Sequence, residues 1–277
     1  MSALIFSTSA VMIKTVVSYT GPFTAAGIRY LMAFFFLFVW LHMRREGSLP
    51  HTHSNWMRFT VMGVCTATAS GALFVALRTI SATTASLAFC LTSIPTLLFS
   101  ALWLKERLSF SQLSGLALAI GGSLLFFSPQ WERGQALAIG LLVLFVFADS
   151  TVVVVARGMA RTRRVKSLAL TAYPIGIAGG ILFCLGAAME GLPRMPLSAW
   201  GILLGLAIVN TGIGFLLFYY SLRHLTAIKA YVVTNLSPFG TALIAWATLG
   251  ERLLPLQVAA MALALAGASL VQSRRHS

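Results

Sequence analysis

Three ionisable side chains lie within long apolar stretches of this 277-residue chain: Lys14, Arg29 and Asp149. If these stretches cross a membrane, each charge costs about 3 kcal/mol, and such side chains usually face the protein interior or a water-filled cavity. Asp149 is the acidic residue deepest within a stretch. Three roles remain open for it: a carboxylate that couples proton movement, a partner for a substrate ammonium group, or a group that caps or pairs within a helix bundle.

Lys14 and Arg29 lie in the first two apolar stretches, at different depths. Lys14 is about one helical turn from the end of its stretch, where it either faces a cavity or extends its ammonium group to the membrane surface. Arg29 is about two turns inside its stretch. We expect Arg29 to line a cavity or to serve the structure.

A second group of candidates combines hydroxyls, amides, aromatic rings and prolines near the middle of the stretches. The segment Leu91-Thr92-Ser93 corresponds to Leu236-Ser237-Pro238 at a spacing of 145 residues. Small hydroxyls and nearby prolines free backbone groups at mid-depth, where transporters place their sites. We therefore expect a cavity lined by Phe74, Phe89, Thr92, Ser93, Asn210, Phe215, Tyr219, Tyr231, Asn235 and Ser237, with Pro95 and Pro238 as hinges. Ordinary helix packing is the alternative for each of these residues.

The apolar stretches themselves predict the fold class. The chain is 58% hydrophobic and only 9% charged, which leaves too little polar surface for a soluble protein. Continuous apolar runs of roughly 20 residues predict transmembrane helices, whereas a barrel would show alternating segments of about 10 residues. We predict an all-α integral membrane protein with ten transmembrane helices, at roughly 3–18, 22–43, 56–77, 82–104, 111–128, 136–156, 168–189, 198–222, 227–249 and 255–272.

The chain also repeats itself at a spacing of 145 residues. Glu106-Arg107-Leu108 recurs as Glu251-Arg252-Leu253, for example, and Ala117-Leu118-Ala119 as Ala262-Leu263-Ala264. Five spans per repeat is an odd number, so the second repeat must run inverted relative to the first. We predict two inverted five-helix repeats, residues 1–129 and 134–273, with the substrate site between them. Glu106 and Glu251 are expected to pair with Arg107, Arg252 or helix termini.

Basic residues predict the orientation of the chain. The net charge is +14, and fourteen of the 20 Lys and Arg residues fall in the connections on one side of the predicted membrane, with four on the other. This bias predicts that both termini are cytoplasmic. The lipid bilayer is therefore the partner that explains the charge, and no nucleic acid is expected. Whether the chain forms a homodimer stays open.

Enzyme and metal-site motifs are missing from the sequence. It contains no His-Glu-x-x-His segment and no Gly-x-x-x-x-Gly-Lys loop. Cys65, Cys90 and Cys184 all lie inside apolar runs, so they form neither a disulfide framework nor a metal site. We expect no enzymatic activity, no cofactor and no metal ion.

Taken together, these features resemble the ten-helix EamA-type branch of the drug/metabolite transporter superfamily. The resemblance rests on Phe6-Ser7-Thr8, on Gly21-Pro22 followed by Arg29, and on the duplicated Glu-Arg element at Glu106 and Glu251. It implies export or exchange of small organic metabolites by alternating access. Two residues depart from the family pattern: Ser93 stands where a proline is frequent, and Asp149 where an aromatic residue is more frequent.

From these observations we predict a secondary transporter that exports small organic metabolites, with amino acids as the leading substrate class, across the bacterial inner membrane. An exporter of drugs or other metabolites is one alternative. A non-transporting membrane scaffold or receptor is another, although the longest connections, of about a dozen residues, leave no room for a soluble domain.

Overall fold

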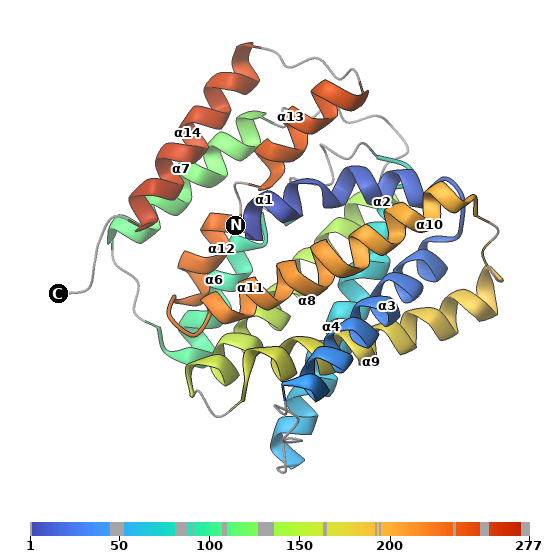
Figure 1. Cartoon of the computed structure of the whole chain (residues 1–277). Helices are drawn as coiled ribbons and strands as arrows, with labels where there is room; N and C mark the ends of the chain where they lie inside the picture. The colour runs from blue at the N-terminus through green and yellow to red at the C-terminus, as the bar shows by residue number, and fades with distance from the viewer. Residues whose placement is uncertain are drawn as a thin grey trace.

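The computed structural model describes residues 2–44, 53–80, 88–89, 91–106, 110–126, 136–162, 165–191, 193, 195–234, 237–249 and 255–272. Within these ranges the chain is helical and contains no strand (Figure 1). The prediction of an all-α integral membrane protein is confirmed. Five helices are long and apolar enough to cross a membrane: Pro22–Met43, His53–Ala76, Ala136–Arg161, Ser167–Met189 and Leu197–Ser221. The count of ten spans stays a prediction.

Helices follow one another along the described part of the chain. In order they are α1 (Ser2–Ser7), α2 (Ser9–Val17), α3 (Pro22–Met43), α4 (His53–Ala76), α6 (Ser93–Leu104), α7 (Phe110–Phe126), α8 (Ala136–Arg161), α9 (Ser167–Met189), α10 (Leu197–Gly205), the π-helix η1 (Leu206–Gly214), α11 (Phe215–Ser221), α12 (Ala227–Thr234), α13 (Ser237–Leu249) and α14 (Pro255–Gln272). Three of these form one continuous rod, because η1 joins α10 to α11 without a break.

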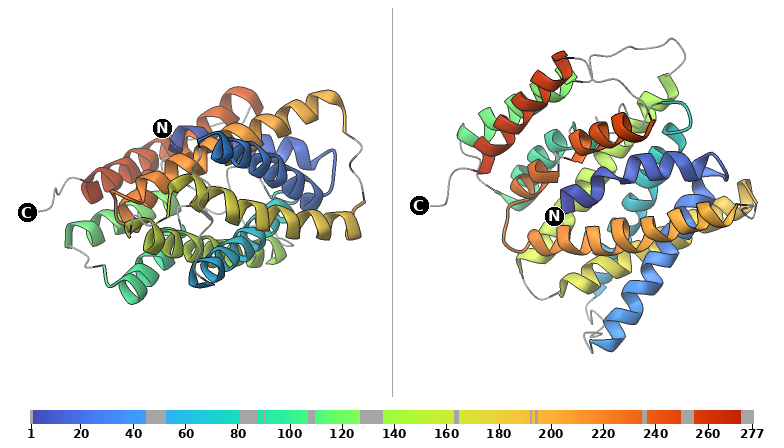
Figure 2. Two further views of the ribbon diagram at one scale, coloured as in Figure 1. Left: turned by 60° about the horizontal axis from the view of Figure 1, so that its bottom comes forward. Right: turned by 45° about the horizontal axis from the view of Figure 1, so that its top comes forward.

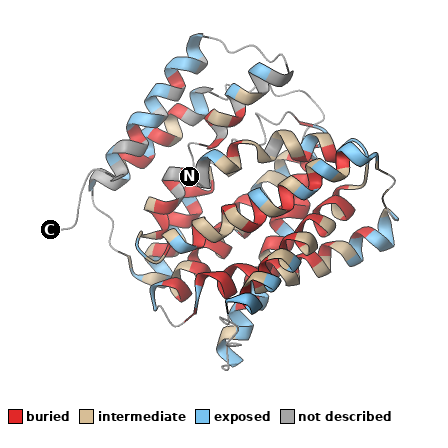
Figure 3. Ribbon diagram, viewed as in Figure 1, coloured by how far each residue is buried: buried red, intermediate tan, exposed pale blue. Residues whose placement is uncertain are grey.

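The bundle packs helices of the first half against helices of the second half. Helix α3 lies against α9, α4 against α8, and α7 against α14. Figure 2 shows the α7–α14 pair at one edge of the bundle, beside the larger group around α3, α4 and α9. Figure 3 shows that buried residues concentrate in this larger group, which therefore contains most of the core.

Glycines allow α3 and α9 to approach closely. A Cβ atom placed on Gly27 of α3 would lie 2.5 Å from the backbone nitrogen of Phe183, and one on Gly186 of α9 would lie 2.5 Å from the backbone nitrogen of Thr24. Real Cβ atoms do not come this near to backbone, so these positions require glycine. Close contact through small residues is a common way for membrane helices to associate.

A carboxylate fixes one end of the same helix pair. Glu190, which follows α9, accepts hydrogen bonds from the backbone N–H groups of Phe23 (3.1 Å) and Thr24 (2.8 Å) in the first turn of α3. These N–H groups have no partner within their own helix, and a negative charge there is favoured by the helix dipole. The contact lies where α3 begins and α9 ends, as in an antiparallel pair, and Arg29 follows about two turns further along α3.

Glu106 forms an ion pair, but with a partner other than the expected Arg107. Its Oε1 atom lies 2.9 Å from Nε of Arg157, near the C-terminal end of α8. The Nη1 atom of Arg157 also donates a 2.6 Å hydrogen bond to the carbonyl oxygen of Leu222. Helix α8 continues beyond the predicted end at residue 156, which brings Arg157 to both partners. Arg107, Glu251 and Arg252 lie outside the described residues.

Candidate functional site

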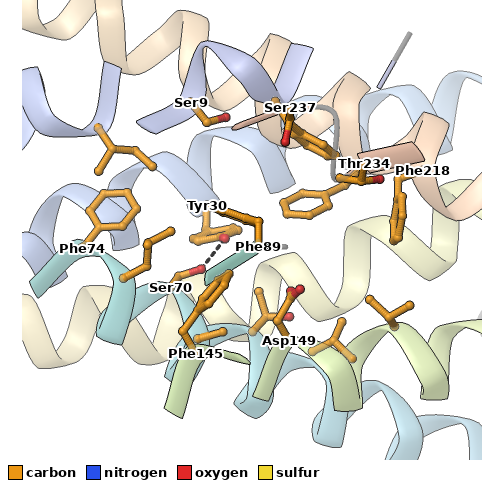
Figure 4. A pocket seen from close by; sticks show the side chains of 18 of the residues that line it. Ser9, Tyr30, Ser70, Phe74, Phe89, Phe145, Asp149, Phe218, Thr234 and Ser237 are labelled. Atoms are coloured by element: carbon orange, nitrogen blue, oxygen red, sulfur yellow. Dashed lines mark hydrogen bonds between the residues drawn. The ribbon is translucent and has the colours of Figure 1, made fainter. Parts of the chain in front are cut away.

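A cavity with a volume of about 80 Å³ lies inside the bundle, between helices of both halves. Its walls come from α1, α2, α3, α4, α8, α11, α12 and α13, and from the short helical segment at Phe89. The lining residues are Phe6, Ser9, Ile13, Arg29, Tyr30, Thr66, Ala69, Ser70, Leu73, Phe74, Phe89, Phe145, Asp149, Val152, Val153, Phe215, Phe218, Tyr219, Thr234, Ser237 and Thr241. Figure 4 shows ten of them with their labels.

Arg29 is the positive charge of this cavity. Its side chain is buried, with 4% exposed, and its Nε donates a 2.6 Å hydrogen bond to Oγ1 of Thr211. The guanidinium lies 5.4 Å from the ring centre of Tyr30 and 5.8 Å from that of Phe74, within range of cation–π attraction. An arginine stays charged at any physiological pH and presents several parallel donors. Arg29 therefore offers a fixed site for a carboxylate.

Asp149 is the negative charge of the same cavity, and it is partly buried in α8. Phe145, Val152 and Val153 line the cavity from the same helix face, at helical spacing from Asp149. The next residue, Ser150, has its Oγ within 3.0 Å of the carbonyl oxygen of Thr92. The same Oγ lies 2.7 Å from the carbonyl oxygen of Val146, so Ser150 brings α8 close to the residue that precedes α6.

Eight aromatic rings contribute to the remaining wall. Phe89 meets Phe145 edge to face at 4.8 Å, and Phe215 lies 5.3 Å from Phe6. Eight lining residues also carry hydroxyls, among them Tyr30, whose hydroxyl is 2.5 Å from Oγ of Ser70 (Figure 4). A wall that combines apolar and aromatic side chains with polar groups is typical of sites for small organic ligands.

The model of the EamA-like transporter family matches residues 1–128 and again residues 136–273. The chain belongs to the EamA-like transporter family. It is 26% identical to an uncharacterized transporter from Archaeoglobus fulgidus over 291 residues, which cover all of this chain and 96% of that protein. It is also similar to a protein of known crystal structure, with a TM-score of 0.75 and 18% identity over 97% of this chain and 95% of the other. At 18% identity, this structural similarity shows a shared fold and nothing further about function.

Several predicted cavity residues of this EamA-like protein do line the cavity. They are Phe74, Phe89, Phe215, Tyr219 and Ser237, together with Arg29 and Asp149. Lys14 is not among the lining residues, and its side chain is exposed in the last turn of α2. Of the two roles predicted for Lys14, exposure agrees with the ammonium group reaching the membrane surface.

Asn210 lies beside the cavity rather than in its wall. Its Oδ1 accepts hydrogen bonds from Oγ of Ser9 (2.7 Å) and Oγ1 of Thr8 (3.3 Å). Thr8 separates α1 from α2, and Asn210 lies in η1, so the amide joins two irregular points of the bundle. The structure thus gives Asn210 a positioning role for Ser9, which does line the cavity.

The other predicted residues of this EamA-like protein lie behind the wall or outside the described part. Thr92 and Ser93 are buried, and Oγ1 of Thr92 donates a 2.8 Å hydrogen bond to the carbonyl oxygen of Ala88 in its own turn. Pro95 is buried in the first turn of α6. Asn235 and the side chains of Tyr231 and Pro238 lie outside the described residues. The hinge roles of Pro95 and Pro238 stay predictions.

Sequence reasoning missed lining residues that lie next to, or one turn from, the intramembrane charges. Tyr30 follows Arg29 directly, and Phe145, Val152 and Val153 are three or four residues from Asp149. Helical spacing around Asp149 would have found the three residues of α8, whereas Tyr30, as the direct neighbour of Arg29, does not follow from that spacing. Thr66 and Ser70 lie four residues apart on α4, so they mark one helix face, but no charge marks that face in the sequence.

Proposed function

We propose that this EamA-like protein exports zwitterionic small metabolites, with amino acids as the substrate class, by alternating access across the bacterial inner membrane. The proposal rests on one observation: Arg29 and Asp149 line the same cavity. An α-amino acid carries a carboxylate that fits a guanidinium and an ammonium that fits a carboxylate. Because α3 supplies one charge and α8 the other, a zwitterion in the cavity connects the two halves of the chain.

The rest of the cavity suits the side chain of such a substrate. The rings of Phe74, Phe89 and Phe145 offer apolar contact, and the hydroxyls of Ser237 and Thr234 border the same space (Figure 4). A volume of about 80 Å³ is small beside ligand pockets of about 300–1,000 Å³. The helices must therefore separate to admit an amino acid, as alternating access requires.

Helix packing supports the inverted repeat on which alternating access depends. If the two halves are related by an inverted repeat, each contact between them has a counterpart with the roles exchanged. Helix α4 packs on α9, and its counterpart is α3 packing on η1. Helix α1 packs on α13, and its counterpart is α8 packing on α6. The pairs α3–α9 and α7–α14 are their own counterparts, as expected on a pseudo-two-fold axis.

Counterflow into liposomes tests the function. Purified protein is reconstituted into vesicles loaded with an unlabelled amino acid, and uptake of labelled amino acids, amines and organic acids is measured against protein-free vesicles. The proposal predicts exchange of at least one amino acid. Exchange of lipophilic cations without amino acids would favour a drug exporter. No exchange and no ligand-induced change across the panel would favour a scaffold or receptor.

A further inference from the structure

A second cavity, of about 420 Å³, lies where the C-terminal end of α3 meets the N-terminal end of α9 and the end of α11. Three basic side chains line it: Arg44, Lys166 and Arg223. Trp40 and Tyr220 add two aromatic rings. Among the described residues that form its wall, none is acidic. The described part of its wall therefore carries basic side chains.

Two buried donor atoms of the lining residues find no hydrogen-bond partner in the described part of the chain: Oγ of Ser167 and Nε of Arg223. Ser167 is 7% exposed and is the first residue of α9. The backbone N–H groups of that first turn also lack partners within the helix. Buried donors left unpaired are costly, and an acceptor oxygen of a ligand would satisfy each of them. The donors around Ser167 therefore favour a ligand with several acceptor oxygens.

The opposite end of the α3–α9 pair contains the equivalent helix N-terminus, that of α3. There, the carboxylate of Glu190 caps the first turn of α3. The repeat spacing of 145 residues relates Pro22, at the start of α3, to Ser167, and relates Glu190 to Arg45. In the sequence, the position that corresponds to the capping Glu190 is therefore a basic residue, Arg45.

We propose that this cavity binds a phosphate group with net negative charge. The first turn of α9 and the hydroxyl of Ser167 donate hydrogen bonds to its oxygens, as helix N-termini do in many phosphate sites. The guanidinium groups of Arg223 and Arg44 supply charge-assisted hydrogen bonds from the other side. The site lies apart from Arg29 and Asp149, so it holds whether or not the central cavity carries amino acids.

An anionic lipid headgroup and a soluble phosphate share this chemistry. The cavity lies at the predicted cytoplasmic end of the helices, where basic pockets between membrane helices bind anionic headgroups. Trp40 and Tyr220 are residue types that favour the membrane–water interface. Leu168 of α9 and Leu216 and Leu217 of α11 complete the lining with apolar surface that fits an acyl chain.

The test titrates purified protein in detergent with dioleoyl-phosphatidylglycerol, dioleoyl-phosphatidylcholine or inorganic phosphate and follows the melting temperature. The variants are Ser167→Ala and the double variant Arg44→Gln/Lys166→Gln. Arg58→Gln is the matched control, because Arg58 is exposed on α4 and does not line the cavity. Without ligand, Ser167→Ala should melt at or above the wild-type temperature, because its Oγ has no hydrogen bond to lose and a buried unpaired hydroxyl is costly.

We expect phosphatidylglycerol, but not phosphatidylcholine, to raise the melting temperature saturably in the wild type and in Arg58→Gln. Ser167→Ala should raise the half-saturating concentration about tenfold, and the double variant should abolish the shift. A shift with inorganic phosphate alone, lost in the same variants, would support the site and assign it to soluble phosphates.

Two results would overturn the proposal. One is that neither ligand gives a shift that the cavity variants reduce relative to Arg58→Gln. The other is a melting temperature of ligand-free Ser167→Ala below that of the wild type, since this would mean that the hydroxyl already has an internal partner.

Discussion

Arg29 of α3 is joined to Thr211, 182 residues later in the chain, by a 2.6 Å hydrogen bond from Nε to Oγ1. Thr211 lies in the π-helix η1, and its own hydroxyl donates to the carbonyl oxygen of Leu206, five residues back. Short π-helical turns are frequent at functional sites because they change the direction of side chains. Here the turn directs a hydroxyl at a buried arginine, and this contact connects the two halves of the protein beside the cavity.

Replacing Thr211 by valine tests whether this bond positions Arg29 for a substrate carboxylate. Thr211→Val keeps the shape of the side chain but removes the acceptor of Arg29. A hydrogen bond to a charged group contributes about 1.5–3 kcal/mol, so we expect the apparent affinity for carboxylate-bearing substrates to fall about 10- to 100-fold. Counterflow at several substrate concentrations measures this change.

The matched control is Thr68→Val on α4, an exposed threonine whose hydroxyl bonds to Val64 of its own helix. It should leave transport unchanged. Equal affinities in Thr211→Val and Thr68→Val would mean that the Arg29–Thr211 bond serves stability alone.

Glycine contacts between α3 and α9 provide a test of the packing that supports Arg29. Gly27→Ala and Gly186→Ala each place a methyl group against partner backbone. Overpacking of this kind costs about 1–3 kcal/mol, so we expect melting temperatures several degrees lower, measured by thermal unfolding in detergent.

Gly180→Ala is the control for this pair, because a Cβ atom on Gly180 meets nothing within 4 Å. It should melt at or slightly above the wild-type temperature, since alanine favours helix more than glycine. Equal melting temperatures of Gly27→Ala and Gly180→Ala would contradict the close packing of α3 against α9.

The Glu106–Arg157 ion pair is expected to contribute to stability as a coupled unit. Both side chains are largely buried, with 10% and 14% exposed, and removing one partner from a buried pair costs about 3–5 kcal/mol. Glu106→Gln and Arg157→Gln should each lower stability, and the double variant should lose less than the two single losses together. Unfolding in mixed micelles measures the coupling. Strict additivity would show that the two charges do not stabilise one another.

Cysteine labelling tests the predicted orientation of the chain. In a background lacking Cys65, Cys90 and Cys184, we expect Arg133→Cys to react with a membrane-impermeant maleimide in intact cells. Arg163→Cys should react after permeabilisation, because the bias of Lys and Arg predicts that its connection is cytoplasmic. Labelling of Arg163→Cys from outside would contradict the predicted orientation.

Sequence predicted the long helices well, because their signal is local. The span predicted at 22–43 is α3, Pro22–Met43, and the span predicted at 168–189 is α9, Ser167–Met189. Apolar runs of this length, opened by Pro22 in α3, leave little choice of boundary. The π-helix η1 was not predicted, because a shift from α to π hydrogen bonding leaves no mark in hydropathy.

The sequence predicted the two charged residues and some of the aromatic residues that line the candidate site, but not all of its lining residues. When every face of a helix is apolar, composition does not show which face turns inward. Arg29 and Asp149 could be found because charge is costly in lipid. Thr92 could not be placed, because a hydroxyl in a membrane helix can bond to its own backbone, as its bond to Ala88 shows.

Substitution of Asp149 distinguishes three roles of its carboxylate: binding a substrate ammonium, coupling protons, or stabilising the fold. If it binds the substrate ammonium, Asp149→Asn should weaken binding of amino acids and amines at every pH, with folding intact. If it only couples protons, the variant should lose pH-driven flux and keep substrate exchange. If it is structural, the variant should melt earlier, and activity should scale with the amount of folded protein.

The most direct test is inhibition of amino-acid counterflow by three matched compounds: the amino acid, the amine that lacks its carboxylate, and the acid that lacks its ammonium. In the wild type, the amino acid should inhibit best. In Asp149→Asn, inhibition by the amino acid and the amine should weaken about tenfold or more, while the acid, held by Arg29, should inhibit as before. Equal inhibition by all three compounds in the wild type, or an unchanged order in Asp149→Asn, would contradict recognition of a zwitterion by Arg29 and Asp149.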